Sequence, residues 1–308
     1  MKLSVIIPTH NPNEQRLQRT LDGLCAQTFP AAQWELLVVD NASLPIVRLP
    51  AQGVRSDLSV RIVQEFRLGL SSARKTGLRE SRGEIIVFVD DDNVLAPDYL
   101  EQVCAAFARL PRVGALGGKS LPEFAAPVAT DDWRREFFPL LALRDLGDNE
   151  LVSQGLRPPG SSVHIYPAFA PIGAGMALRI EALQTWLTTK SNTSDRRGDE
   201  LTSAGDNDMV LSIMKAGWEV GYLPALTLTH LIPAHRVATD YLARLNFGIQ
   251  KSWTQVLLAH DASPWPPIPG WSVPLRKLKA WFAHRAWRSP AARIRWLGAC
   301  GHFEGRAY

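Results

Sequence analysis

The first ninety residues contain four short runs of apolar residues, and each run is continuous rather than alternating. A continuous run of this length is typical of a parallel β-strand that is covered on both faces. We therefore expect four such strands, with the sequences "LSVIIP" (3–8), "WELLVVD" (34–40), "VRIVQEF" (60–66) and "EIIVFVD" (84–90).

Two segments between these runs have the spacing of amphipathic helices. Segment 13–27 places Leu17, Leu21 and Leu24 along one face, and segment 69–84 has serines near its start and a glycine near its end. Strands and helices that alternate at this length predict βαβ units in a doubly wound α/β sheet.

Beyond residue 111 the pattern is less regular, because proline, glycine and aromatic residues interrupt short apolar pieces. We expect an extended sheet with loops here, a mobile polar loop over 188–205, and then a helix and a strand up to residue 231. Helices separated by a proline-rich hinge are expected to follow. The chain is thus divided into three parts, 1–118, 119–235 and 236–308.

Composition places the chain among soluble globular enzymes, with 46% hydrophobic and 21% charged residues. The three cysteines form no CxxC pair, so neither a disulfide framework nor a zinc site is predicted, and a reducing compartment fits. The apolar start is interrupted by Pro8, unlike a signal peptide, and no later run approaches the ~18 apolar residues of a membrane span. We therefore expect a cytoplasmic protein.

The basic residues are concentrated at the C-terminal end. The net charge is +4, yet residues 271–308 contain eight lysines and arginines and a single acidic residue, Glu304. Four large aromatic residues lie among them, at positions 281, 282, 287 and 296. This segment is either a solvated helix packed on the body or a peripheral contact with the inner face of a membrane. Because the rest of the chain is not basic, we expect no nucleic-acid partner.

Polar residues follow each predicted strand. In an open α/β sheet, ligands bind outside the carboxyl ends of the strands, so these residues are expected to converge on one crevice. They are Thr9 and His10, Asp40 and Asn41, Glu65, and the triplet Asp90, Asp91 and Asp92.

The aspartate triplet is the strongest candidate for chemistry. In an extended strand Asp90 and Asp92 would point to one side and Asp91 to the other. Two carboxylates in one crevice repel each other unless a cation lies between them, and Mg²⁺ or Mn²⁺ with a substrate diphosphate suits such a pair. The alternative is a solvated acidic turn or a helix N-cap.

Six segments together resemble family 2 glycosyltransferases in their order and spacing. They are "SVIIPTHN", "LLVVDNAS", "LGLSSARKTGL", "GEIIVFVDDDNVLAPDYL", "GAGMALR" and "GDNDMVLSIMKAGW", which cover residues 3 to about 230. The resemblance implies a GT-A fold, with a Rossmann-like mixed, mainly parallel sheet flanked by helices, and a C-terminal helical extension. It also implies a nucleotide-sugar donor, usually a UDP-sugar.

The resemblance also suggests donor-binding residues. Pro8 and Thr9 would line the nucleotide pocket, and Asp40 would accept a hydrogen bond from the base, unless it is a turn residue after its strand. Arg74 matches a basic residue near the nucleotide and diphosphate. Asp91 is the middle residue of the triplet and is expected on the donor side.

By the same resemblance, Asp90 and Asp92 match the family's DxD motif and would hold Mn²⁺ or Mg²⁺. His230 occupies the position of a histidine that completes the metal or diphosphate site in many relatives, although a lone histidine at a strand end is more often only hydrogen-bonded. Arg236 is a candidate diphosphate clamp, with a surface arginine as the alternative.

Asp206 falls on the family's general base, which would take the proton from the acceptor hydroxyl. The chain departs from the family here, because Gly205 stands where a glutamate usually precedes the base, and Asp208 lies two residues further on. Either aspartate could instead cap the following helix.

The resulting hypothesis is a metal-dependent, inverting glycosyltransferase that acts in polysaccharide or cell-surface glycan biosynthesis. Residues 1–118 would bind the donor, 119–235 would supply the acceptor site and the base, and the acceptor would be a glycan or a lipid-linked glycan. Two alternatives stay open: a nucleotidyltransferase, although no glycine-rich loop with a lysine follows the first strand, and a non-catalytic scaffold. No GxGxxG motif follows that strand either, which disfavours a dinucleotide-dependent oxidoreductase.

Overall fold

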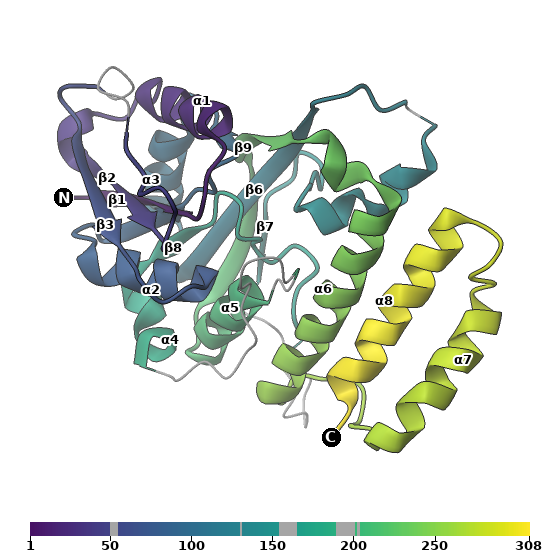
Figure 1. The fold of residues 1–308 in the computed structure, drawn as a ribbon. Coiled ribbons are helices and arrows are strands. Elements are labelled where there is room, and N and C mark those ends of the chain that lie inside the picture. Colours follow the sequence, from purple (N-terminus) through teal and green to yellow (C-terminus); the bar gives the residue numbers. More distant parts are fainter. Residues whose placement is uncertain (50–54, 130, 154–164, 189–200, 202–203) are drawn as a thin grey trace.

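The computed structural model describes all residues except 50–54, 130, 154–164, 189–200 and 202–203. Its centre is a nine-stranded mixed sheet in the order β3-β2-β1-β4-β8-β6-β9-β5, with β7 paired to β9 (Figure 1). The strands are β1 Leu3–Thr9, β2 Trp34–Asp40, β3 Ser59–Gln64, β4 Ile85–Phe88, β5 Asn93–Leu95, β6 Val113–Phe124, β7 Leu151–Ser153, β8 Ala177–Arg179 and β9 Glu219–Ile232.

The four strands expected from the apolar runs are present and parallel. β1 and β2 are buried at every position, which confirms that both of their faces are covered. For β3 this expectation is wrong: each of its residues is exposed or half-buried, because β3 lies at the end of the sheet and pairs with β2. The apolar residues of β3 therefore cover the edge of the sheet rather than its centre.

Helices cover both faces of the sheet. They are α1 Glu14–Cys25, α2 Leu70–Glu80, α3 Tyr99–Arg109, α4 Gln184–Thr188 and α5 Gly205–Lys215, with short 3₁₀ segments η1 Ala31–Gln33, η2 Trp133–Leu141, η3 Ile180–Leu183, η4 Ala234–Val237 and η5 Gly270–Ser272. One core contains residues of α1 and α3, and the other contains residues of α2, α4 and α5. Successive residues of β1 contribute to opposite cores, as strand geometry requires.

The expected helices α1 and α2 are confirmed, with small differences at their ends. α1 buries Leu17, Leu21 and Leu24. α2 begins after Gly69, without a capping side chain, so its serines lie inside the first turn rather than at the cap. The difference follows from Gly69, which is the N-cap and has a positive φ that glycine adopts readily.

The expectation of a mainly parallel sheet holds for the first half. In the second half β8 runs antiparallel to both β4 and β6, and β5 and β7 run antiparallel to β9, while β6 and β9 are parallel. β6 also runs across residue 118, so the first two parts of the chain share one continuous sheet. The polar loop expected over 188–205 lies mostly outside the described residues.

The C-terminal extension is helical, as predicted. It consists of α6 Thr239–Ala259, α7 Val273–Ala283 and α8 Pro290–Arg306, which lie side by side with α8 in the middle (Figure 1). Glycines at positions 298, 301 and 305 of α8 face α6, where an added Cβ would overlap with Asn246 or with backbone oxygens. Close helix packing therefore depends on these small residues. Among the described helices, none is long and apolar enough to cross a bilayer.

Candidate active site

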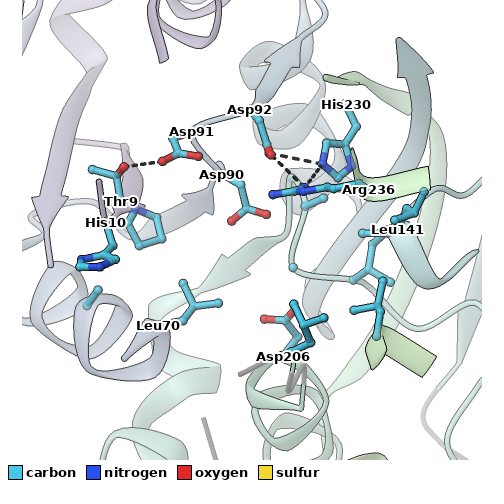
Figure 2. Close-up of a pocket in the computed structure, with 18 of the residues that line it drawn as sticks. Thr9, His10, Leu70, Asp90, Asp91, Asp92, Leu141, Asp206, His230 and Arg236 are labelled. Carbon is cyan, nitrogen blue, oxygen red and sulfur yellow. Dashed lines mark hydrogen bonds and ion pairs between the residues drawn. The ribbon is translucent and has the colours of Figure 1, made fainter. Parts of the chain in front are cut away.

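A cavity of about 580 Å³ lies at the carboxyl ends of β1 and β4, as predicted for the strand ends. Its lining comes from segments far apart in the sequence: Pro8 and Thr9 at the end of β1, and Arg74 of α2. Figure 2 shows the aspartate triplet after β4 together with Asp206 of α5, His230 of β9, and Arg236. The fold therefore brings together nearly all of the site residues that the sequence singled out.

The triplet lies in a turn and not in the extended strand from which the alternation was predicted. The Asn93 N–H donates to the Asp90 carbonyl at 3.0 Å, which reverses the chain directly after β4. In a turn successive residues do not alternate between two faces, and all three aspartates line the cavity.

Asp91 is half-buried and lies on the side of β1. The Thr9 hydroxyl donates a hydrogen bond to its carboxylate (Figure 2). Burial, together with the neighbouring charge of Asp92, raises the pKa of Asp91 to about 6. Thr9 and Asp91 thus form one wall of the cavity.

Asp92 forms a cluster with His230 and Arg236 on the opposite side. Its Oδ1 lies 3.3 Å from His230 Nε2, and its Oδ2 lies 3.0 Å from Arg236 Nη1 (Figure 2). Burial alone would raise the pKa of Asp92, but the hydrogen bond from His230 and the charge of Arg236 outweigh it and hold this pKa at about 2. Asp92 is therefore an anionic group throughout the physiological range.

Arg74 connects two acidic groups across the cavity floor. Its side chain is buried, forms an ion pair with Asp206, and reaches to 3.9 Å from Asp90 Oδ1. The Asp206 carboxylate has room there because residue 173 is a glycine, where an added Cβ would lie 2.2 Å from Asp206 Oδ2. The arginine expected beside the diphosphate thus positions Asp206 as well.

Asp206 and Asp208 have different surroundings although both lie in the first turn of α5. Asp206 lines the cavity. Asp208 is buried behind it, where it accepts hydrogen bonds from Trp186 Nε1 at 2.9 Å and from His260 Nε2 at 2.7 Å. Neither aspartate is the N-cap, which is Ala204, so the capping alternative is wrong: the helix begins two residues earlier than a cap at Asp206 requires.

Asp40, like Glu65 after β3, is a predicted site residue that does not line the cavity. Its carboxylate is buried and accepts from the N–H groups of Ser43 and Val47, both at 3.0 Å, and from Gln64 Nε2 at 3.1 Å. Burial raises its pKa, but these hydrogen bonds, that of Ser43 first, outweigh burial and lower the pKa below its ordinary value. Asn41, the next residue, lines the cavity instead.

The sequence interpretation missed the wall on the side of the C-terminal extension. One face of α6 lines the cavity with an apolar row at intervals of four residues, namely Tyr241, Leu245, Ile249 and Trp253. Arg144 lines it too, and its guanidinium donates to the Ala170 carbonyl without an acidic partner among the described residues. The four-residue spacing was readable in the sequence, but it does not reveal which partner a helix face meets.

Comparisons with known proteins identify the family and the fold. The family model "Glycosyl transferase family 2" matches residues 4–138, and "Glycosyl transferase family group 2" matches residues 85–244, more than half of the chain. The poly(ribitol-phosphate) β-N-acetylglucosaminyltransferase TarS of Staphylococcus aureus is 31% identical over 107 residues, which are 34% of this chain and 18% of that protein. A glucosyl-dolichyl phosphate glucuronosyltransferase of Haloferax volcanii is 23% identical over 80% of this chain and 74% of its own length.

Solved structures of two such enzymes have a similar fold. The mannosyltransferase PcManGT of Pyrobaculum calidifontis, in complex with GDP-Man and Mn²⁺, superimposes with a TM-score of 0.55 at 21% identity, over 95% of this chain and 73% of that chain. S. aureus TarS 1-349 in complex with UDP-GlcNAc gives a TM-score of 0.53 at 17% identity, over 99% of this chain and 90% of that chain. Several matches to curated relatives span only 13% to 33% of the relative's length. On the family match and the shared fold, the chain belongs to the family 2 glycosyltransferases and has the GT-A fold.

Proposed function

We propose that the protein transfers a sugar from a nucleotide-diphosphate donor, a UDP-sugar, to a hydroxyl group of an acceptor, with inversion at the anomeric carbon. The observation that carries this proposal is the placement of Asp206. Its carboxylate lines the same cavity as the aspartate triplet, and Arg74 holds it in place. A base and a diphosphate site that share one cavity suit a single displacement.

The donor is proposed to lie along β1 and the triplet. Pro8, Thr9 and Asn41 line this end of the cavity and leave room for a nucleotide. Arg236 adds a guanidinium, the group that pairs best with phosphate oxygens. The carboxylate of Asp40 already has three donors, so its contribution to base recognition would pass through the loop that it holds.

The chemistry of the donor set fits a divalent ion that is shared with a substrate. Asp92 Oδ1 and His230 Nε2 lie 3.3 Å apart, and Asp90 lines the same cavity. Among the described residues no cluster of three His, Cys, Asp or Glu side chains could hold a metal alone. Mg²⁺ or Mn²⁺ often binds one or two protein groups and completes its shell with phosphate oxygens and water. When bound, such an ion supplies positive charge beside the departing diphosphate.

Asp206 is proposed as the general base. The guanidinium of Arg74 stabilises its ionised form and fixes the carboxylate in the cavity. Asp206 would accept the proton of the acceptor hydroxyl while that oxygen attacks the anomeric carbon and the nucleoside diphosphate leaves. Proton transfer of this kind typically contributes ~10²–10⁴-fold to the rate.

The acceptor is proposed to enter along α6. Its apolar row and the guanidinium of Arg144, which has no acidic partner among the described residues, form a wall that suits an amphipathic, anionic molecule, such as a glycan linked to a lipid through phosphate. A glycan acceptor without a lipid would use the aromatic side chains Tyr241 and Trp253 for contacts with sugar rings. A lipid-linked acceptor would bring the enzyme to a membrane surface.

Titration calorimetry with UDP, GDP and their sugar conjugates, with and without Mn²⁺, tests the donor assignment. We expect metal-dependent binding of UDP that is lost in Asp92→Asn and kept in Asp57→Asn, an exposed carboxylate outside the cavity. Asp206→Asn is expected to bind UDP but to release it from the UDP-sugar at least 10²-fold more slowly. Absence of nucleotide binding would refute the transferase proposal, and binding without turnover in the wild type would indicate a scaffold.

A further inference from the structure

The outermost helix of the extension, α7, has an exposed apolar stripe on one face. The stripe consists of Leu275, Leu278 and Phe282 of α7 and of Trp271 in the preceding segment η5, whose exposed fractions are 63%, 56%, 60% and 77%. Their spacing of four, three and four residues places them in one row along the helix. Single exposed apolar residues are common on soluble proteins, but a continuous row is not.

The opposite face of α7 is fully used for packing. It buries Val273 and Ala280, and Trp296 of α8 donates its indole N–H to the Lys277 carbonyl at 3.0 Å. Trp281 packs edge-on against Trp296 with ring centroids 4.7 Å apart. The stripe is therefore an additional apolar surface that the fold of this helix does not require.

Basic residues flank the stripe, and no acidic residue neutralises them. Residues 262–303 contain no aspartate or glutamate. Glu304, the next acidic residue, is paired with Lys251 and Lys277. The remaining cations of α7, of the turn after it and of the start of α8 are exposed and form no ion pair within the described chain: Arg276, Lys279, Arg285, Arg288 and Arg293.

We propose that this surface, α7 with the turn to α8, lies in the headgroup region of an anionic lipid bilayer. The stripe would enter the boundary of the acyl chains, and the arginines and lysines would pair with lipid phosphates, as in other amphipathic interfacial helices. Trp287, exposed in the turn between the helices, adds the amphipathic ring that is typical of membrane interfaces.

Charge decides between a bilayer and a second copy of the chain. Two copies that joined their α7 stripes would bring two sets of unpaired cations together, and like charges at such a contact are unfavourable. An anionic surface instead neutralises the same residues. The binding is independent of the transferase activity, because none of these residues lines the cavity.

Flotation of the full chain with phosphatidylcholine vesicles, with and without phosphatidylglycerol, tests the proposal. We expect flotation with the anionic vesicles only, weakened at high salt. The double variant Leu278→Asp/Phe282→Asp should lose at least about tenfold in partitioning, since it places charges into the apolar stripe. The control Phe66→Asp changes a side chain that is 84% exposed elsewhere and should float like the wild type. Arg285→Ser/Arg288→Ser should lose about 25-fold, roughly fivefold for each cation.

Three outcomes would overturn the proposal. The wild type could fail to float with anionic vesicles, or the stripe variant could float as well as the wild type. Light scattering could instead show a dimer that becomes a monomer in the stripe variant, which would identify a second copy as the occupant. The substituted side chains are exposed, so unchanged urea unfolding is expected and separates loss of binding from loss of folding.

Discussion

Asp206 and Asp208 lie two residues apart on α5, and the structure predicts opposite consequences when each is replaced by asparagine. Asp206 lines the cavity, whereas Asp208 accepts hydrogen bonds from Trp186 and His260 behind it. Asparagine keeps the size of the side chain but removes the charge and replaces one acceptor oxygen by a donor. Asp206→Asn should therefore abolish the base, and Asp208→Asn should weaken the packing of α5.

The loss of stability expected for Asp208→Asn follows from the two hydrogen bonds that the Asp208 carboxylate accepts. One of the two donors would face the new amide N–H₂ and lose its acceptor inside the protein, where Trp186 is 2% exposed. Leaving a buried donor unsatisfied costs about 1–3 kcal/mol. With a total stability of about 5–15 kcal/mol, this loss is large but leaves the variant folded.

For Asp206→Asn we expect a loss of catalytic rate rather than a loss of stability. Loss of the proton acceptor should lower kcat by about 10²–10⁴-fold. The amide oxygen of asparagine still accepts from Arg74, so the effect on unfolding should be smaller than that of Asp208→Asn.

Urea unfolding, followed by tryptophan fluorescence, measures the effect on stability. The rate of UDP release at saturating substrate, divided by the amount of folded protein, measures the effect on catalysis. A reduced unfolding free energy with near-normal turnover is expected for Asp208→Asn, and the reverse for Asp206→Asn. The geometric argument would be refuted if Asp208→Asn lost turnover 10²-fold while Asp206→Asn kept it.

Three further predictions concern the cavity and its support. Gly173→Ala should lower kcat by about 10²-fold, because its Cβ would displace the carboxylate of Asp206, and equal activity in steady-state assays would contradict this. Asp40→Asn should reduce the unfolding free energy by about 1–3 kcal/mol at pH 7. Burial raises the pKa of Asp40, but its hydrogen bonds outweigh burial and lower this pKa below its ordinary value. The difference in unfolding free energy between wild type and variant should therefore vanish as the pH falls below about 4, which urea titrations at several pH values measure. Arg144→Met should raise the KM for a phosphorylated acceptor about tenfold without changing the KM for the donor. Initial rates with each substrate varied in turn measure both KM values, and equal changes in the two would show that Arg144 only supports the fold.

The order of strands and helices in the first ninety residues was predictable because local patterning dominates there. Buried parallel strands need uninterrupted apolar runs, and helix α1 needs its three leucines at helical spacing. β3 differs for a reason that the local pattern does not contain, since a strand's position in the sheet determines whether it is buried.

The site was predictable in its residue types more than in its geometry. Strand-end polarity pointed to the triplet, the resemblance to family 2 glycosyltransferases pointed to Asp206 and His230, and guanidinium chemistry suggested Arg236; the fold gathers them in one cavity. The turn at the triplet was not predicted, because the apolar run suggested a strand up to residue 90, whereas β4 ends at Phe88.

The sequence by itself therefore determined the strand and helix pattern of the first ninety residues, the family, and nearly all of the polar residues proposed for the site, because each is carried by a short motif of neighbouring residues. Only the tertiary structure separated Asp206 from Asp208, withdrew Asp40 into its own loop, and turned one face of α6 toward the cavity. These distinctions depend on which distant side chains meet, such as Asp208 with Trp186 and His260. Local spacing contains no information about such contacts, because they form only when the sheet and the C-terminal helices pack together.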